Sequence, residues 1–243
     1  MTDQTPWIPH EYVEGLPIEL YQTALDFQTL ADHYNIPTFA MGGTLLGAVR
    51  HGGLIPWDDD LDFFIERKHF DAIKKHILPY MEKLGYTWWY YGIDDKGNDL
   101  IERPPGSWSG FQLVTYRENK TIERHIDIFL YEGAPVSETH KQFNMGGWFT
   151  FTYANEDLSI VKRKFGDIEI NTPKNYELAL NANLGGDAWK TTVKKYAHHF
   201  EIKPEDKKPF ETQEFLPAGP FGPLTPINKE DLEKHDIEKR NKL

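Results

Sequence analysis

The segment 41–63 constrains the fold more than any other part of the chain, because it joins a glycine pair to a dense run of acids. Four of five consecutive residues near its end are aspartates: Asp58, Asp59, Asp60 and Asp62. Two unit negative charges about 4 Å apart repel each other by roughly 4 kcal/mol at an effective dielectric constant of 20. Apolar residues flank the run on both sides, which favours partial burial over a solvated acidic turn. The sequence therefore predicts a fold that gathers these carboxylates around a positive charge.

The residues after Trp57 alternate in a way that predicts a β-strand. On such a strand Asp59 points away with Leu61, and three aspartates share the other face: Asp58, Asp60 and Asp62. Three oxygen ligands on one edge suit a hard divalent cation, Mg²⁺ or alternatively Mn²⁺, that also contacts substrate phosphates. An EF-hand calcium loop starting at Asp58 is excluded, because its sixth and twelfth positions hold Phe63 and His69.

The glycine pair lies between a strand-like segment, 38–41, and a short helical segment, 45–49. Glycines at such a junction let backbone N–H groups approach an anion at the start of a helix, where the helix dipole also favours negative charge. The Walker pattern is not satisfied, because Ala48 occupies the position of its lysine, and the Rossmann glycine pattern is absent. We therefore predict a separate kind of anion-binding turn at three residues: Gly42, Gly43 and Thr44.

A third acidic position is expected on a later strand. Residues 122–130 are strand-like, and Asp127 lies there between Ile126 and Ile128. An aspartate is rarely buried unless it is paired or bound to a metal. A neighbouring strand that carries the acidic run would supply such a partner, so we expect Asp127 to complete the carboxylate cluster.

Two basic residues, Arg50 and His51, separate the glycine pair from the acidic run. An arginine at this position can hold a diphosphate through two parallel hydrogen bonds and offset the local negative charge. The alternative is an exposed pair in a loop, and we rank Arg50 above His51 as a site residue. We interpret His125, on the later strand, as a packed imidazole.

Two strings resemble a known family. The string Gly43–Asp62 closely resembles the signature of the LicD/fukutin-related family, within the nucleotidyltransferase superfamily, and His125–Phe129 resembles its second block. Residues 165–189 are similar to the closing block, with Gly185-Gly186 where the family usually has Tyr-Gly. The resemblance covers about residues 20 to 195. It implies an α+β fold with a nucleotidyltransferase-like mixed β-sheet flanked by helices.

The resemblance also implies an activity. This is the metal-dependent transfer of a substituted phosphate, phosphocholine or an alditol phosphate, from a CDP-linked donor to a sugar hydroxyl of a cell-surface glycan. Carried over by position, it assigns catalysis to three residues: Asp60, Asp62 and Asp127. The same three residues would bind the metal together with Asp58. The donor phosphates would contact Gly42, Gly43, Thr44 and Arg50. Asp127 is also the candidate base for the attacking hydroxyl.

Three other functions remain open. A glycosyltransferase could use Asp60-Leu61-Asp62 as the metal motif for a sugar nucleotide, although the glycine pair upstream argues against it. A nucleotidyltransferase would leave the nucleotide on a protein or a small molecule. A non-catalytic binding domain would keep the fold and show no metal-dependent turnover with any donor.

Length and composition frame these expectations. The chain has 243 residues with 39% hydrophobic content, enough for one large domain, and we expect a catalytic domain over 1–202 and a Pro-rich, then charged, tail over 203–243. The net charge of −11 and the lack of a dense basic stretch argue against nucleic-acid binding. Cysteine is absent, which excludes disulfides and thiolate chemistry. We expect a cytoplasmic protein without a leader or membrane span, able to touch a membrane-bound acceptor.

Periodicity predicts the remaining elements. Apolar residues at helical spacing predict helices over 17–34 and 67–84, and residues 161–170 are typical of a β-hairpin. A helix capped by Thr172, with Pro173 at its first position, is expected to end near Gly185. Another helix is expected over 187–199.

Overall fold

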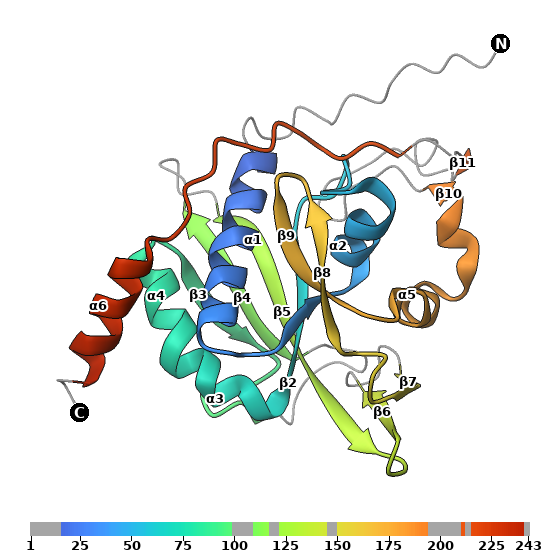
Figure 1. The fold of residues 1–243 in the computed structure, drawn as a ribbon, viewed down its shortest axis with the longest axis horizontal. Helices are drawn as coiled ribbons and strands as arrows, with labels where there is room; N and C mark the ends of the chain where they lie inside the picture. The colour runs from blue at the N-terminus through green and yellow to red at the C-terminus, as the bar shows by residue number, and fades with distance from the viewer. Residues whose placement is uncertain are drawn as a thin grey trace.

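The computed structural model describes residues 16–98, 109–116, 122–144, 150–193, 210–211 and 215–240. A mixed sheet with strand order β1-β2-β5-β4-β3 forms its centre, and β6 and β7 extend it from β5. The strands are β1 (Thr38–Ala40), β2 (Asp62–Glu66), β3 (Thr87–Tyr91), β4 (Gly110–Tyr116), β5 (Ile122–Pro135), β6 (His140–Asn144) and β7 (Thr150–Ala154). Helices flank this sheet (Figure 1), so the predicted α+β class is confirmed.

One strand pair in the sheet is parallel. β2 runs parallel to β5, whereas β1 pairs with β2, and β4 with both β3 and β5, in antiparallel fashion. Parallel neighbours need a long crossover, and here it contains the helical segment 67–83 as well as β3 and β4. The crossover brings the beginning of β2 next to the middle of β5, where Asp62 is the register partner of Asp127.

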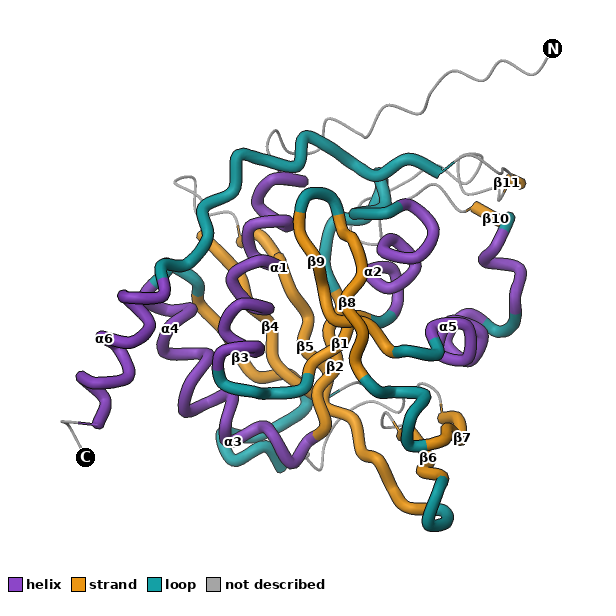
Figure 2. The backbone as a smooth tube through the Cα atoms, viewed as in Figure 1, coloured by secondary structure: helices purple, strands orange, loops and turns teal. Residues whose placement is uncertain are grey.

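The two faces of the sheet are packed differently. Helix α1 (Leu16–His33) lies in front of the sheet in Figure 2, and its Phe27 packs against Phe63 of β2 with ring centroids 5.3 Å apart. Residues next to each other in a strand point to opposite faces. Phe64 therefore faces the other way and stacks on Phe129 at 4.8 Å. Asp62 and Asp127 alternate onto this aromatic face, at the end of the sheet where β2 begins.

The predicted helix over 67–84 is confirmed as a continuous helical stretch. It starts with a 3₁₀ turn, Arg67–His69, and continues through α3 (Phe70–Ala72), a π-helical turn (Ile73–Ile77) and α4 (Leu78–Lys83). Its apolar stripe includes Phe70, Ile73, Ile77 and Met81, all buried. The amphipathic pattern therefore identified the face that packs on the core.

The hairpin is also confirmed, as β8 (Ile160–Phe165) and β9 (Ile168–Pro173), but the start of the next helix was predicted wrongly. Thr172 belongs to β9, where it pairs with Val161 and is fully buried. Helix α5 (Tyr176–Leu184) is capped by Asn175 instead, whose side chain accepts a hydrogen bond from the backbone N–H of Leu178. Pro173 ends the strand, a position that proline tolerates because it needs no ladder N–H.

The helix expected over 187–199 is wrong in its described part. Residues Asp187–Lys190 form a 3₁₀ turn, and β10 (Thr192–Val193) then pairs with β11 (Phe210–Glu211). Residues 194–199 lie outside the described part of the chain. A buried Trp189, whose indole N–H donates to Asn181, holds the turn against α5.

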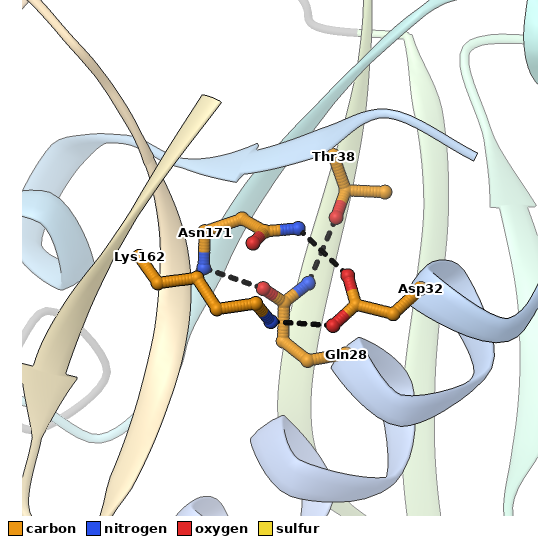
Figure 3. Close-up of polar contacts among 5 residues, drawn as sticks. All are labelled: Gln28, Asp32, Thr38, Lys162 and Asn171. Carbon is orange, nitrogen blue, oxygen red and sulfur yellow. Dashed lines mark hydrogen bonds and ion pairs between the residues drawn. The ribbon is translucent and has the colours of Figure 1, made fainter. Parts of the chain in front are cut away.

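A polar network joins α1 to the hairpin and the edge strand (Figure 3); it is buried at Gln28, Thr38 and Asn171 and exposed at Asp32 and Lys162. The Gln28 amide donates to the Thr38 hydroxyl at 2.8 Å, and its oxygen accepts from the backbone N–H of Asn171 at 2.6 Å. Asp32 accepts from the Asn171 amide and forms an ion pair with Lys162. Because buried polar groups are costly without partners, this network fixes the register between α1, β1, β8 and β9.

The C-terminal segment packs along the outside of α1. In Figure 1 it crosses the end of α1 and then leads to α6 (Lys229–Arg240) beside α4. The Tyr21 hydroxyl donates to the Ala218 carbonyl and accepts from the backbone N–H of Leu54, both at 2.9 Å. At the other end, the Tyr34 hydroxyl donates to Asp236 at 2.7 Å. Within the described residues, no helix is both long and apolar enough to span a bilayer.

Asp26 gives a prediction about stability. Burial raises its pKa from 3.8 to about 6, despite hydrogen bonds from Gln22 and Tyr86. A carboxyl whose pKa is raised by folding stabilises the protein most below pH 4, and this contribution is lost as pH rises through about 6. As pH rises from 4 to 7, the unfolding free energy of Asp26→Asn minus that of the parent protein should increase by roughly 2 kcal/mol. Urea unfolding at both pH values checks this, and a constant difference between the two proteins contradicts it.

Candidate functional site

Three aspartates converge at the end of the sheet where β2 begins. Asp62 opens β2, Asp127 lies opposite it on β5, and Asp60 lies in the segment leading into β2. One carboxylate oxygen of each lies within 4.8 Å of those of the other two. Asp60 and Asp127 are only 7% and 8% exposed. The structure thus brings together the three residues that the sequence placed in one cluster.

The local structure of the acidic run differs from the prediction. The strand starts at Asp62, not directly after Trp57, because a turn in which the Asp58 N–H donates to the Ile55 carbonyl precedes an irregular segment. Asp59 therefore does not follow the alternation of a strand. It is buried, and one of its carboxylate oxygens lies within 4.8 Å of those of Asp58 and Asp60. The acidic run therefore forms a second cluster of carboxylates, Asp58, Asp59 and Asp60, which shares Asp60 with the first cluster.

The glycine pair forms the first turn of α2 (Gly42–Leu46), which continues as a π-helical turn, Gly47–His51. Gly42 has φ +56°, and a Cβ there would lie 2.5 Å from Oδ2 of Asp62. A Cβ on Gly43 would lie 2.3 Å from Oδ2 of Asp58. A Cβ atom cannot approach an oxygen this closely, so only glycine at these two positions lets the helix backbone pack against the carboxylates.

Hydrogen bonds fasten this helix to β2. The Thr44 hydroxyl accepts from the backbone N–H of Asp62 at 2.7 Å, and the Met41 N–H donates to the Asp62 carbonyl at 3.1 Å. The backbone N–H of Gly43 donates to the Asp62 carboxylate. Thr44 therefore sets the position of an acidic residue. Its side chain does not cap α2, which has no side-chain cap.

The carboxylates are electrostatically strained without a counter-charge. Burial raises the pKa of Asp58 well above its usual value, and the negative charges of Asp60 and Asp59 raise it further. Burial likewise raises the pKa of Asp62, followed by the charges of Asp60, Asp127 and Asp58. Within the described residues, the side chains that cluster here offer carboxylate oxygens as ligands. A hard dication such as Mg²⁺ or Mn²⁺ fits such a donor set and would relieve the repulsion.

Sequence reasoning missed Gln112. It lies on β4 opposite Asp127, is buried, and its amide N–H donates to Oδ1 of Asp127 at 2.6 Å. The backbone N–H of Asp127 donates to the Leu61 carbonyl at 2.8 Å. The orientation of Asp127 is therefore set on both sides. A polar residue between Phe111 and Leu113 was the available signal, but only strand pairing reveals its partner.

Arg50 and His51 are not an exposed loop pair. Arg50 donates from Nη1 to the carbonyls of Trp189 and Thr192, at 2.6 and 3.1 Å, and from Nε to Nε2 of His51. His51 is buried and donates from Nδ1 to the Leu216 carbonyl. Burial lowers the pKa of Arg50 to about 10 and that of His51 to about 4, so the imidazole is neutral at physiological pH. The His125 side chain lies outside the described part of the structure.

A cavity of about 380 Å³ opens beside the carboxylate cluster. Gly43 and Asp58 line it where it adjoins the cluster, and Arg50 and Thr192 line it further along the helix. The walls between are apolar and aromatic: Leu46, Ile55, Trp57, Leu184, Ala188 and Trp189. The second wall comes from the closing segment 184–192, which the sequence did not assign to the site.

Comparisons with known proteins identify the family of the segment that carries this site. The model of the LicD/FKTN/FKRP nucleotidyltransferase domain matches residues 35–175, which include the glycine pair and all the clustered aspartates. Uncharacterized proteins of Rickettsia typhi and Rickettsia prowazekii are each 33% identical to this chain, over 223 and 215 residues. These alignments cover 87% and 85% of this chain, and 62% and 71% of the relatives.

A third relative has a described activity. The lipopolysaccharide cholinephosphotransferase LicD of Haemophilus influenzae is 29% identical over 113 residues, which cover 45% of this chain and 40% of that protein. The family match spans more than half of the sequence and contains the carboxylates, the glycine turn and the strands that carry them. The chain therefore belongs to the LicD/FKTN/FKRP family of nucleotidyltransferase-domain proteins.

Proposed function

We propose that this protein transfers a substituted phosphate, phosphocholine or an alditol phosphate, from a CDP-linked donor to a sugar hydroxyl of a cell-surface glycan, in a metal-dependent reaction. The observation that carries the proposal is the convergence of the Asp60, Asp62 and Asp127 carboxylates within 4.8 Å. Family membership and the name of the Haemophilus influenzae relative support the choice of reaction. The chain spans 62% of the length of the Rickettsia typhi relative, so we propose this activity for the site described above and not for the full length of that relative.

Each site residue has a role that follows from its surroundings. Asp60, Asp62 and Asp127, with Asp58 beside them, would hold Mg²⁺ or Mn²⁺. When bound, the metal neutralises charge on the donor diphosphate. Gly42 and Gly43 bring the first turn of α2 against Asp62 and Asp58, so donor phosphates at the carboxylates would also meet this turn. Thr44 positions Asp62 through its backbone N–H, and Arg50 contributes a positive charge to the adjoining cavity.

The transfer step needs a proton acceptor. The acceptor hydroxyl oxygen attacks the phosphorus of the substituted phosphate, the bond from that phosphorus to the CMP oxygen breaks, and CMP leaves. The hydroxyl proton passes to Asp127, which remains our candidate base. Gln112 donates a hydrogen bond to Oδ1 of Asp127 and so orients this carboxylate. In-line transfer of this kind depends chiefly on such positioning and on charge neutralisation.

A donor panel tests the proposal against its rivals. The full chain is incubated with CDP-choline, CDP-ribitol or UDP-sugars and a glycan acceptor, with Mg²⁺ or with EDTA. We expect free CMP and a phosphorylated glycan from one CDP donor, only when Mg²⁺ is present. Sugar transfer from a UDP-sugar would indicate a glycosyltransferase, and a nucleotide left on the acceptor would indicate a nucleotidyltransferase. No metal-dependent turnover with any donor would indicate a binding domain.

A further inference from the structure

The cavity next to the carboxylates extends away from them along one face of the helix that starts at Gly42. Gly43, Leu46 and Arg50 recur at the spacing of helical turns, and all three line it. Gly43 and Arg50 are seven residues apart, which corresponds to roughly 10 Å along a helix. The Arg50 guanidinium is held by the carbonyls of Trp189 and Thr192, in the closing segment. The cavity therefore reaches from the metal-binding end to a second, cationic end.

The walls of the cavity suit a flat, mostly apolar group. Trp57 comes from the loop before the acidic run and Trp189 from the closing segment. Leu184 lies 45% exposed at the same cavity and leaves apolar surface for a ligand. The volume of about 380 Å³ lies within the range of roughly 300–1,000 Å³ typical of small-molecule sites. A base stacks well on such surfaces, because every base has a π-face.

The positive charge of Arg50 at the far end of the cavity favours the nucleobase of the donor over the transferred group. A trimethylammonium group carries a positive charge that Arg50 repels, and a polyol would leave its hydroxyls against apolar walls without partners. A nucleobase is uncharged and carries hydrogen-bond acceptors on its edge. It can therefore place its faces on the walls and its edge on Arg50.

We propose that this cavity binds the nucleobase of the donor and that Arg50 selects cytosine there, an inference that rests on the proposed function. Within the described residues, the hydrogen bonds of Arg50 use Nε and Nη1, so the N–H groups of Nη2 are available to a ligand. One of these N–H groups can donate to N3 of a cytosine. Cytosine presents two adjacent acceptors, O2 and N3, whereas uracil has an N–H at position 3 that opposes an arginine donor. The transferred group then lies on the other side of the carboxylates.

A pair of neighbouring variants tests the location. Ala188 is exposed and lines the cavity, whereas Asp187, in the same 3₁₀ turn, is exposed and does not line it. Ala188→Trp fills the cavity from its surface without removing a buried side chain, and Asp187→Trp is its matched control. Titration calorimetry with Mg²⁺ measures CMP, UMP and phosphocholine binding to each protein. We expect Ala188→Trp to weaken CMP binding about tenfold or more and to leave phosphocholine binding unchanged. We expect Asp187→Trp to bind CMP and phosphocholine as tightly as the parent protein does.

Base selection is the second readout. We expect the parent protein to bind CMP roughly tenfold more tightly than UMP, and Arg50→Gln to remove most of this preference. The inference is overturned if Ala188→Trp weakens phosphocholine and spares CMP, if it spares both, or if the parent protein binds CMP no better than UMP. Turnover keeps the two proposals separate. Suppose that the parent protein releases CMP from CDP-choline in a metal-dependent reaction, and that Ala188→Trp does not change its affinity for CMP. This result would support the proposed function and refute the nucleobase site.

Discussion

Asp127→Asn and Asp60→Asn should each lower the rate of phosphate transfer by at least about 1,000-fold, because each removes a charge from the cluster and the first also removes the candidate base. Asparagine keeps the shape of the side chain, so the loss reports charge and proton transfer. The measurement is CMP release under saturating Mg²⁺ and donor. Asp95→Asn, at an exposed aspartate in the loop before β4, is the control and should retain full turnover. An Asp127→Asn protein with full turnover would remove Asp127 from its role.

The same substitutions should have the opposite effect on stability without metal. The clustered carboxylates repel one another, since an oxygen of each lies within 4.8 Å of the others. An amide at one of these positions removes repulsion on the order of 1–3 kcal/mol. We expect Asp60→Asn to raise the unfolding free energy in EDTA, and added Mg²⁺ to stabilise the parent protein more than the variant. A variant that is less stable than the parent in EDTA would contradict the electrostatic account of the cluster.

Gly43→Ala should reduce transfer by about 100-fold or more, because misplacing a reacting group by about 1 Å has effects of this size. Its new Cβ would overlap Oδ2 of Asp58, a half-buried carboxylate that Asp59 and Asp60 crowd. Gly42→Ala should do the same to Asp62, and its φ of +56° adds a folding cost of about 1–2 kcal/mol. Initial rates across a Mg²⁺ titration, with urea unfolding alongside, separate the two effects.

Gly52 provides the matched control for backbone strain. Its φ is +72°, and nothing lies within 4 Å of a Cβ built on it. Gly52→Ala should therefore lose a similar unfolding free energy to Gly42→Ala while turnover stays close to the parent value. If both variants lose turnover equally, loss of stability explains the effect, and contact between the glycine turn and the carboxylates does not.

Several parts of the fold were predictable because their signals are local. The helices over 17–34 and 67–84 and the hairpin around 161–170 were all recognised from residues close together in sequence. Boundaries failed where two local signals competed. Thr172-Pro173 has the pattern of a helix start, yet pairing with Val161 and complete burial keep Thr172 in β9. Long-range strand pairing outweighed the weaker preference for a cap.

The site shows the same division. The density of aspartates and a lone acid among β-branched residues identified the members of the cluster, because charge at apolar positions needs compensation wherever the chain places it. The arrangement within the run did not follow from alternation, since a turn and an irregular segment occupy the positions before Asp62. Arg50 was recognised as a site residue. Its hydrogen bonds to the carbonyls of Trp189 and Thr192 depend on a wall far along the chain.

By itself, the sequence determined which side chains carry the charge, which segments form the principal helices and strands, and which family the chain belongs to. Tertiary structure decided that β2 and β5 run parallel with Asp62 opposite Asp127, that Gln112 orients the third acid, and that segment 184–192 closes a cavity beside them. The reason is physical. Charge and periodicity are written in neighbouring residues, whereas strand register and cavity walls arise from contacts between residues distant in the chain, which only the packed core brings together.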